Sequence, residues 1–159
     1  MILDERLEFA DAASVAAAAG TALIGDVIDL GSVARDIGEG QTMWLVINVD
    51  TEIITAGVAG TLKFQLVSDA QAAIAVDGTA TVHFDTGTFV TGSAAANDVA
   101  MNAGETICAI ALPRQGKVYE RFLGILAVTA TTTTTAGKIN AFLTLNQPHG
   151  AKLYAEGIN

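Results

Sequence analysis

Short apolar runs, seven to nine residues long, recur along the chain, and a turn signal separates each run from the next. The clearest are Met43–Val49, Leu62–Ser68, Thr106–Leu112, Arg121–Thr129 and Lys138–Leu145. In the second, Leu62, Phe64 and Leu66 alternate with polar residues, as in a strand with one buried face. With turn signals every 8–15 residues and no convincing helix, the pattern predicts an all-β fold. The expected architecture is a jelly roll or β-sandwich of about eight antiparallel strands.

Two runs are apolar on both faces, which is typical of strands in the middle of a sandwich. They are Met43–Val49 and Thr106–Leu112, and the second contains the single cysteine, Cys108, expected to be a buried thiol. In the run Arg121–Thr129, Gly124 indicates a bulge or a close approach of another backbone.

Turn residues predict how some strands are connected. Asp77-Gly78 is a strong hairpin signal and predicts that Ile74–Val76 pairs with Thr79–Phe84. Ala136-Gly137 is expected to turn the chain into its return strand, Lys138–Leu145. Residues 85–97, rich in Gly, Thr, Ser and Ala, are expected to form a long exposed connection.

The chain has 159 residues, the size of one domain, and shows no linker or internal repeat. We therefore expect residues 1–159 to form a single β-sandwich domain. An N-terminal arm of about residues 1–12 and a C-terminal tail of about residues 146–159 have little periodicity of their own.

The charge balance argues against several partners. Formal net charge is −9 and the pI is about 4.4. Such a chain repels phosphate backbones and anionic membranes, so we expect it to bind no nucleic acid and no membrane. The first residues lack the basic segment of a secretory signal, and no apolar stretch is long enough for a spanning helix. The expected site of synthesis is the cytoplasm.

Residues for catalysis or metal binding are scarce. One cysteine excludes an internal disulfide and a cysteine-based zinc site, and the two histidines, His83 and His149, lie far apart in the sequence. The acids around Asp26 and Asp29 do not match a calcium loop and suit turns and caps. A pair of carboxylates acting as in a glycosidase stays open as an alternative. We therefore expect no catalytic residue, no metal and no cofactor, and a protein that is not an enzyme.

The order and spacing of short motifs resemble the capsid cement (decoration) proteins of tailed bacteriophages, the group of the Bordetella short-tailed phage in particular. The motifs are Met1–Asp4, Phe9–Ala12, Val27–Gly31, Ala34–Gly40 before Trp44–Val46, Glu120–Leu123, and Ala136–Ile139 after a Thr-rich segment. Residues 69–104 and the tail depart from that pattern.

The resemblance implies a structural subunit on the outer surface of the icosahedral head, in the virion. Such a subunit would bind the major capsid protein, bridge neighbouring capsomers and stabilise the shell against the pressure of the DNA. It would also bind itself as a homo-oligomer, with a dimer favoured. The alternative is another β-sandwich virion module, either a tail or baseplate subunit or a lectin-like binding domain.

Apolar residues near both termini are the candidates for contacts with the capsid or with another subunit. They are Ile2, Leu3, Leu7, Phe9, Leu153 and Tyr154. The competing interpretation, of equal weight, is that these side chains close the subunit's own core, because the termini of a domain fray unless they are tied down.

Overall fold

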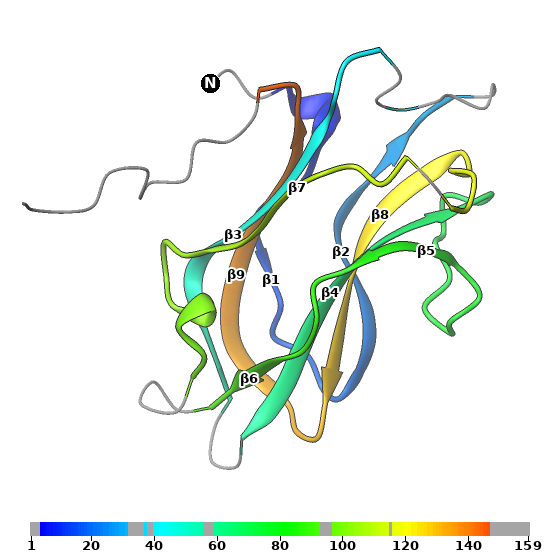
Figure 1. The fold of residues 1–159 in the computed structure, drawn as a ribbon. Coiled ribbons are helices and arrows are strands. Elements are labelled where there is room, and N and C mark those ends of the chain that lie inside the picture. The colour runs from blue at the N-terminus through cyan, green and yellow to red at the C-terminus, as the bar shows by residue number, and fades with distance from the viewer. Residues whose placement is uncertain are drawn as a thin grey trace, which may run out of the picture.

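The structure, a computed structural model, describes residues 4–31, 37, 40–55, 59–92, 97–114 and 116–146. Two antiparallel sheets pack face to face (Figure 1). Their strands are β1 (Glu8–Ser14), β2 (Gly20–Asp29), β3 (Trp44–Thr55), β4 (Gly60–Asp69), β5 (Thr81–Asp85), β6 (Phe89–Thr91), β7 (Thr106–Ala111), β8 (Phe122–Ala130) and β9 (Thr134–Thr144). The helical elements in the described residues are two single 3₁₀ turns, η1 (Glu5–Leu7) and η2 (Val99–Met101). None of these helices has the length that crossing a membrane requires.

The strand order is that of a jelly roll. One sheet runs β1-β9-β3-β7 and the other β2-β8-β4-β5, with β6 also paired to β4. β1 pairs with β9, β2 with β8, β3 with β7 and β4 with β5. This is the pairing produced when one long antiparallel hairpin is wrapped into two sheets. The predicted fold class is confirmed, with nine strands in the described part of the chain instead of about eight.

The core lies between the sheets and uses the alternation seen in the sequence. Leu62, Phe64 and Leu66 of β4 are fully buried, as the period-two pattern predicts. On β9, Ile139 and Ala141 face the same core. β-Branched and aromatic side chains fit this half-buried pleated surface, which explains why these segments become strands.

A second, smaller cluster covers the outer face of the β2-β8-β4 sheet. Ile74 and Ala80, from the loop between β4 and β5, pack on Val67 and Leu126. Gly124 makes room for this loop, because a Cβ there would lie 2.5 Å from Cδ1 of Ile74. The atoms that approach Gly124 belong to the side chains of Ile74 and Leu23, so the predicted close approach of another backbone is wrong, while the alternative of a bulge agrees with the register shift between Ile24 and Ile28 on the paired strand β2. Ile74 and Ala80 thus fold over their own subunit.

Three predictions about individual strands are wrong. Ile74–Val76 is not a strand, because Ile74 and Ala75 pack in the smaller cluster and β5 pairs with β4 instead. Ala136-Gly137 does not turn the chain, since β9 begins at Thr134 and passes through it. The connection at 85–97 is also shorter than expected, because it contains β6.

The expected position of Thr106–Leu112 also needs correction. β7 is an edge strand, paired with β3 alone among the described residues, and half of its residues are exposed. By contrast, β3 lies between β9 and β7, and Leu45, Val46 and Ile47 on both of its faces are buried, as predicted.

The other side of the sandwich is closed by a contact between β1 and β2. Gly25 adopts a φ of +65°, and a Cβ added there would lie 1.9 Å from the carbonyl oxygen of Phe9. This position therefore requires glycine, both for its left-handed backbone and for the space.

Candidate functional site

The N-terminal candidates Leu7 and Phe9 contact the subunit's own core. Phe9 is fully buried on β1, and Leu7, in η1, is half-buried and packs against the same cluster. The positions of both side chains therefore agree with the interpretation that this segment closes the subunit's own core. Ile2, Leu3, Leu153 and Tyr154 lie outside the described residues, so their role as interface residues stays a prediction.

The two ends of the described chain leave the sandwich at the same place. β1 starts at Glu8, and Glu8 pairs with Phe142 near the end of β9. Because the two strands are antiparallel neighbours, the segments before β1 and after β9 continue from one end of one sheet. Sequence reasoning missed this juxtaposition, because it follows from the pairing of β1 with β9.

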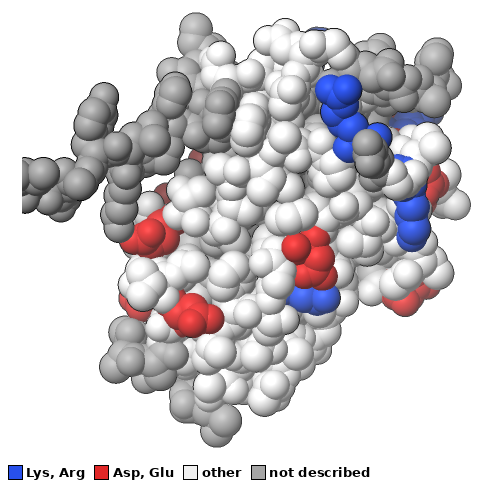
Figure 2. Space-filling view, viewed as in Figure 1, with Lys and Arg blue, Asp and Glu red and all other residues white. Residues whose placement is uncertain are grey.

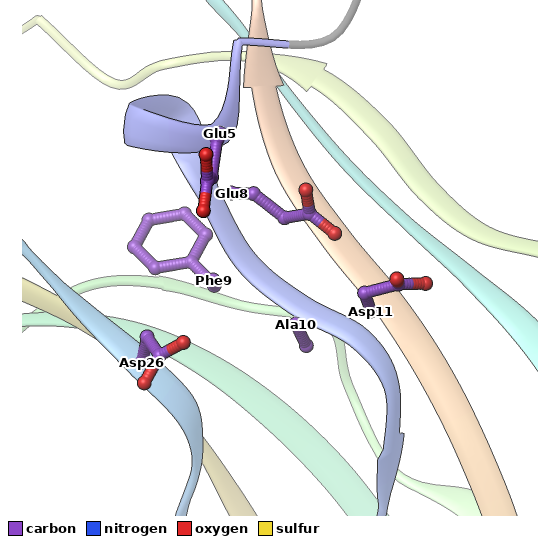
Figure 3. Close-up of a pocket in the computed structure, with 6 residues that line it drawn as sticks. All are labelled: Glu5, Glu8, Phe9, Ala10, Asp11 and Asp26. Atoms are coloured by element: carbon purple, nitrogen blue, oxygen red, sulfur yellow. The ribbon is translucent and has the colours of Figure 1, made fainter.

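Carboxylates gather around a hollow between η1, β1 and β2 (Figure 3). Glu5, Glu8, Asp11 and Asp26 line it together with Phe9 and Ala10, and a neighbouring hollow adds Asp29. Asp26 comes from a different sheet than Glu8. The sequence shows the acids of β2, but their proximity to the acids of β1 follows only from the packing of the two sheets. Arg6 also lines the neighbouring hollow, so acidic side chains outnumber basic ones at this edge.

This acidic edge does not form a metal centre. No cluster of three or more metal-ligating side chains occurs among the residues that the structure describes. Asp29 is engaged instead in a bidentate ion pair, with Nε and Nη2 of Arg121 both 2.8 Å from its carboxylate oxygens. The same guanidinium lies 4.7 Å from the centre of the Phe122 ring.

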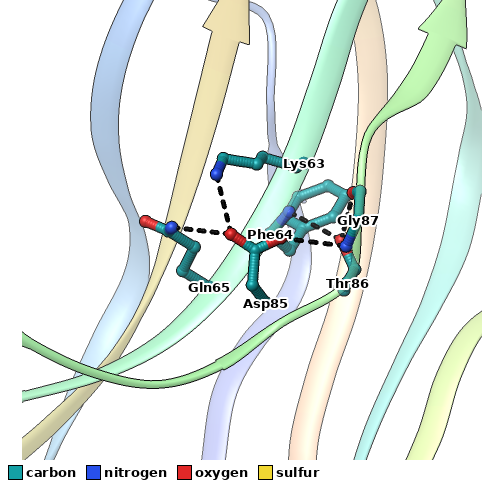
Figure 4. Close-up of polar contacts among 6 residues, drawn as sticks. All are labelled: Lys63, Phe64, Gln65, Asp85, Thr86 and Gly87. Carbon is teal, nitrogen blue, oxygen red and sulfur yellow. Dashed lines mark hydrogen bonds and ion pairs between the residues drawn. The ribbon is translucent and has the colours of Figure 1, made fainter.

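A polar group occupies the outer surface of β4 and β5 (Figure 4). Lys63 Nζ and Gln65 Nε2 donate to one oxygen of Asp85 at 2.7 and 2.8 Å, and Gly87 N donates to the other at 2.9 Å. Burial raises the pKa of Asp85, but the bonds from Lys63, Gln65 and Gly87 outweigh it and hold the pKa below its usual value. The group is a neutralised ion pair that fastens β5 to β4.

Ser68 and His83 form a contact that superficially resembles a catalytic dyad. Ser68 Oγ lies 2.7 Å from His83 Nε2, and Glu120 is close enough to affect His83 electrostatically. However, Ser68 is fully buried and already accepts a hydrogen bond from the backbone N–H of Glu120. The Glu120 carboxylate accepts from Thr81 at 2.9 Å, so it is already engaged with a hydroxyl. The arrangement is that of a structural network.

The rest of this network fixes the segment before β8. The ring of His83 stacks on Tyr119 with 3.9 Å between centroids, and the Tyr119 hydroxyl donates to the carbonyl of Pro113. Burial lowers the pKa of His83 and raises that of Tyr119 to about 12. His83 thus takes part in a structural network through Ser68 and Tyr119. His149 lies outside the described residues.

Cys108 points toward the core from β7 and is half-buried. Burial raises the pKa of its thiol to about 11. A thiol with so high a pKa is a poor nucleophile at neutral pH, because the thiolate is the reactive form.

A family model named Bbp16 matches residues 9–143. The match begins at the second residue of β1, ends one residue before the end of β9, and includes both sheets of the jelly roll. The chain belongs to the Bbp16 family. The protein that gives the Bbp16 family its name is a capsid cement protein of Bordetella phage BPP-1. No curated protein matches the chain.

Membership of the Bbp16 family confirms the resemblance drawn from the sequence motifs. It places the chain among phage structural proteins, and the Ser68–His83 contact described above adds no catalytic geometry to that assignment.

Proposed function

We propose that this protein is a capsid cement protein that binds the outside of an icosahedral phage head. It bridges neighbouring capsomers of the major capsid protein and stabilises the shell against the pressure of packaged DNA. In the virion it forms a homo-oligomer, with a dimer favoured. The observation that carries this proposal is the family match across the whole jelly roll.

The charge distribution supports an outer position. A subunit of net charge −9 would be repelled by DNA inside the head, whereas on the outer surface the same charge favours solubility. Because many copies would bind one shell, their individually weak contacts would together give a large total affinity.

The chain ends support a bridging role. Because Glu8 and Phe142 are paired, the segments that contain Leu3 and Leu153 start from the same end of one sheet. Contacts made by these two segments with neighbouring capsomers would leave the paired strands of the jelly roll intact.

Quantitative mass spectrometry of gradient-purified particles tests the assignment. Hundreds of copies in a simple ratio to the major capsid protein are expected for a cement protein. A handful of copies would instead indicate a tail or baseplate subunit. Absence from particles, together with retention on a glycan column, would indicate a lectin-like domain.

Binding to heads that lack this protein tests the arms. Leu3→Asp and Leu153→Asp should each weaken binding, while circular dichroism shows an unchanged fold. Val76→Asp, at an exposed position in the loop between β4 and β5, is the matched control. Leu7 is unsuitable as a probe, because it packs against the core. Equal occupancy by all variants would refute the role of the arms.

A further inference from the structure

The connection between β7 and β8 crosses from one sheet to the other over the end of the sandwich. Main-chain hydrogen bonds anchor both of its ends, because Leu112 N donates to Met43 O at 2.9 Å and Leu30 N donates to Arg121 O at 2.8 Å. Val118, between these anchors, is 75% exposed. The middle of the β7–β8 connection therefore lies on the surface, and side chains of β4 and β5 hold it there.

One buried hydroxyl binds both the connection and a histidine. Ser68 Oγ accepts from the backbone N–H of Glu120 at 3.0 Å and lies 2.7 Å from His83 Nε2. Ser68 is fully buried, and a buried hydroxyl needs an acceptor for its single hydrogen. The N–H of Glu120 is itself a donor, so the Ser68 hydrogen goes to Nε2. The ring is therefore neutral, with its own hydrogen on Nδ1.

A proton on His83 is incompatible with this arrangement. Nε2 would become a donor, so that Nε2–H and the N–H of Glu120 would both point at Ser68 Oγ. The hydrogen of Ser68 would then lack its acceptor, and a buried polar group without a partner is costly. Moving the connection away from β4 relieves this cost, because water can then reach the hydroxyl.

We propose that the β7–β8 connection is a pH-dependent switch, closed on β4 and β5 while His83 is neutral and opened when His83 takes up a proton. Opening would be local, because the main-chain hydrogen bonds at both ends of the connection involve neither Ser68 nor His83. The inference goes beyond the proposed function, since it concerns the isolated subunit and is independent of binding to a phage head.

Burial is the main reason why the closed conformation keeps His83 neutral. The partly buried ring loses hydration that a cation needs, which lowers its pKa below 6.5. Lys117 on the connection lowers the pKa further by repelling a positive charge, whereas Glu120 raises it. In Figure 2, Lys and Arg side chains lie at the upper right, where the connection runs in Figure 1. Because the closed conformation binds a proton less readily than the open one, falling pH favours opening.

The other titratable groups on the elements around the ring are engaged or stay neutral. Asp85, two residues along β5, is paired with Lys63 at 2.7 Å. Asp69 of β4 accepts from two backbone N–H groups of the loop that follows. Tyr119, stacked on the ring, has a pKa of about 12 and stays neutral. Of these groups, His83 is the one whose charge changes between about pH 5 and about pH 8.

Nitrogen NMR of the imidazole tests the closed conformation without any substitution. At about pH 7.5 the ¹⁵N shifts should show a hydrogen on Nδ1 of His83 and none on Nε2. A hydrogen on Nε2 at this pH would show that Ser68 already accepts from the ring, and would overturn the proposal.

Hydrogen exchange of the Glu120 amide measures opening. Its protection factor, corrected for the intrinsic exchange rate, should be about tenfold lower at about pH 5 than at about pH 7.5, because a buried hydrogen bond is lost. The amide of Val49, which donates to Glu105 O at 2.8 Å in the other sheet, is the internal control and should keep its protection. Unchanged protection of Glu120, or an equal loss at Val49, would refute a local switch.

Three variants assign the response. His83→Gln retains a hydrogen-bonding side chain that does not titrate, so the Glu120 amide should be equally protected at both pH values. His149→Gln replaces the other histidine of the sequence and is the matched control, with the pH response of wild type. Ser68→Ala, which removes the acceptor itself, should leave the Glu120 amide poorly protected at both pH values. A response that persists in His83→Gln or disappears in His149→Gln would overturn the proposal, as would full protection in folded Ser68→Ala.

A spin label on the connection gives an independent readout. Val118→Cys in a Cys108→Ala background carries one nitroxide at a position that is 75% exposed. Its mobility in the electron paramagnetic resonance spectrum should rise between about pH 7.5 and about pH 5. The matched label at Val76→Cys, in the loop between β4 and β5, should not change. Constant mobility at Val118, or an equal rise at both positions, would contradict opening of the connection.

Discussion

Replacing Gly25 by alanine should separate the two strands that close one side of the sandwich. The added Cβ would lie 1.9 Å from the carbonyl oxygen of Phe9, 2.9 Å from its carbonyl carbon and 3.1 Å from Cα of Ala10. All three atoms belong to the backbone, so no side-chain rotation relieves the contact. β1 or β2 must move by about 1.5 Å for the 1.9 Å contact to reach the 3.4 Å at which ordinary packing distances begin.

Two costs add in this variant. A left-handed backbone conformation costs a residue with a Cβ about 1–2 kcal/mol. Forcing an extra carbon into a closely packed site costs about 1–3 kcal/mol. The fully buried side chain of Phe9 lies on the displaced strand and loses contacts when that strand moves. We therefore expect the free energy of unfolding to fall by about 2–5 kcal/mol.

Gly78→Ala is the control that separates the steric cost of Gly25→Ala from its backbone cost. Gly78 also has a left-handed backbone, with a φ of +93°, but no heavy atom lies within 4 Å of an added Cβ. It should therefore show only the backbone cost, about 1–2 kcal/mol.

Urea unfolding followed by the fluorescence of Trp44, the single tryptophan, measures both variants. The steric cost that only Gly25→Ala bears, about 1–3 kcal/mol, should lower its urea midpoint by about 1 M relative to that of Gly78→Ala. Equal midpoints for Gly25→Ala and Gly78→Ala would show that β1 and β2 do not approach as described.

Three further predictions concern single side chains. Phe9→Ala should lower the free energy of unfolding by about 3–5 kcal/mol in the same urea assay, because a fully buried aromatic ring is lost; a change below about 1 kcal/mol would restore the arm interpretation. The pKa of His83 is lowered from 6.5, mainly by burial, so the unfolded chain binds a proton more readily. Stability from this group is complete above pH 6.5 and is lost as pH falls through the lowered pKa. The pH profile of His83→Gln should lack this loss, and an unchanged profile would contradict the assignment. Cys108, with a pKa of about 11, should react with a disulfide reagent at about pH 8 far more slowly in the native protein than in urea. Equal rates would show that the thiol is not buried.

The fold class was predictable because each strand carries its own pattern. Leu62, Phe64 and Leu66 alternate with polar residues, and this alternation alone identifies β4 and its buried face. The strand pairing was not predictable, since contacts such as Glu8 with Phe142 join residues far apart in the sequence. For the same reason the acidic hollow between β1 and β2 was only half visible.

The wrong predictions share a physical cause, which is that tertiary contacts override local signals. Ile74 has the composition of a strand residue but packs on the outer face of a sheet. Gly137 has the composition of a turn residue, yet it allows β9 to pass Ile53, whose Cα would lie 2.8 Å from a Cβ at that position. An apolar run such as β7 looks the same in the sequence whether its strand lies in the middle of a sheet or at its edge.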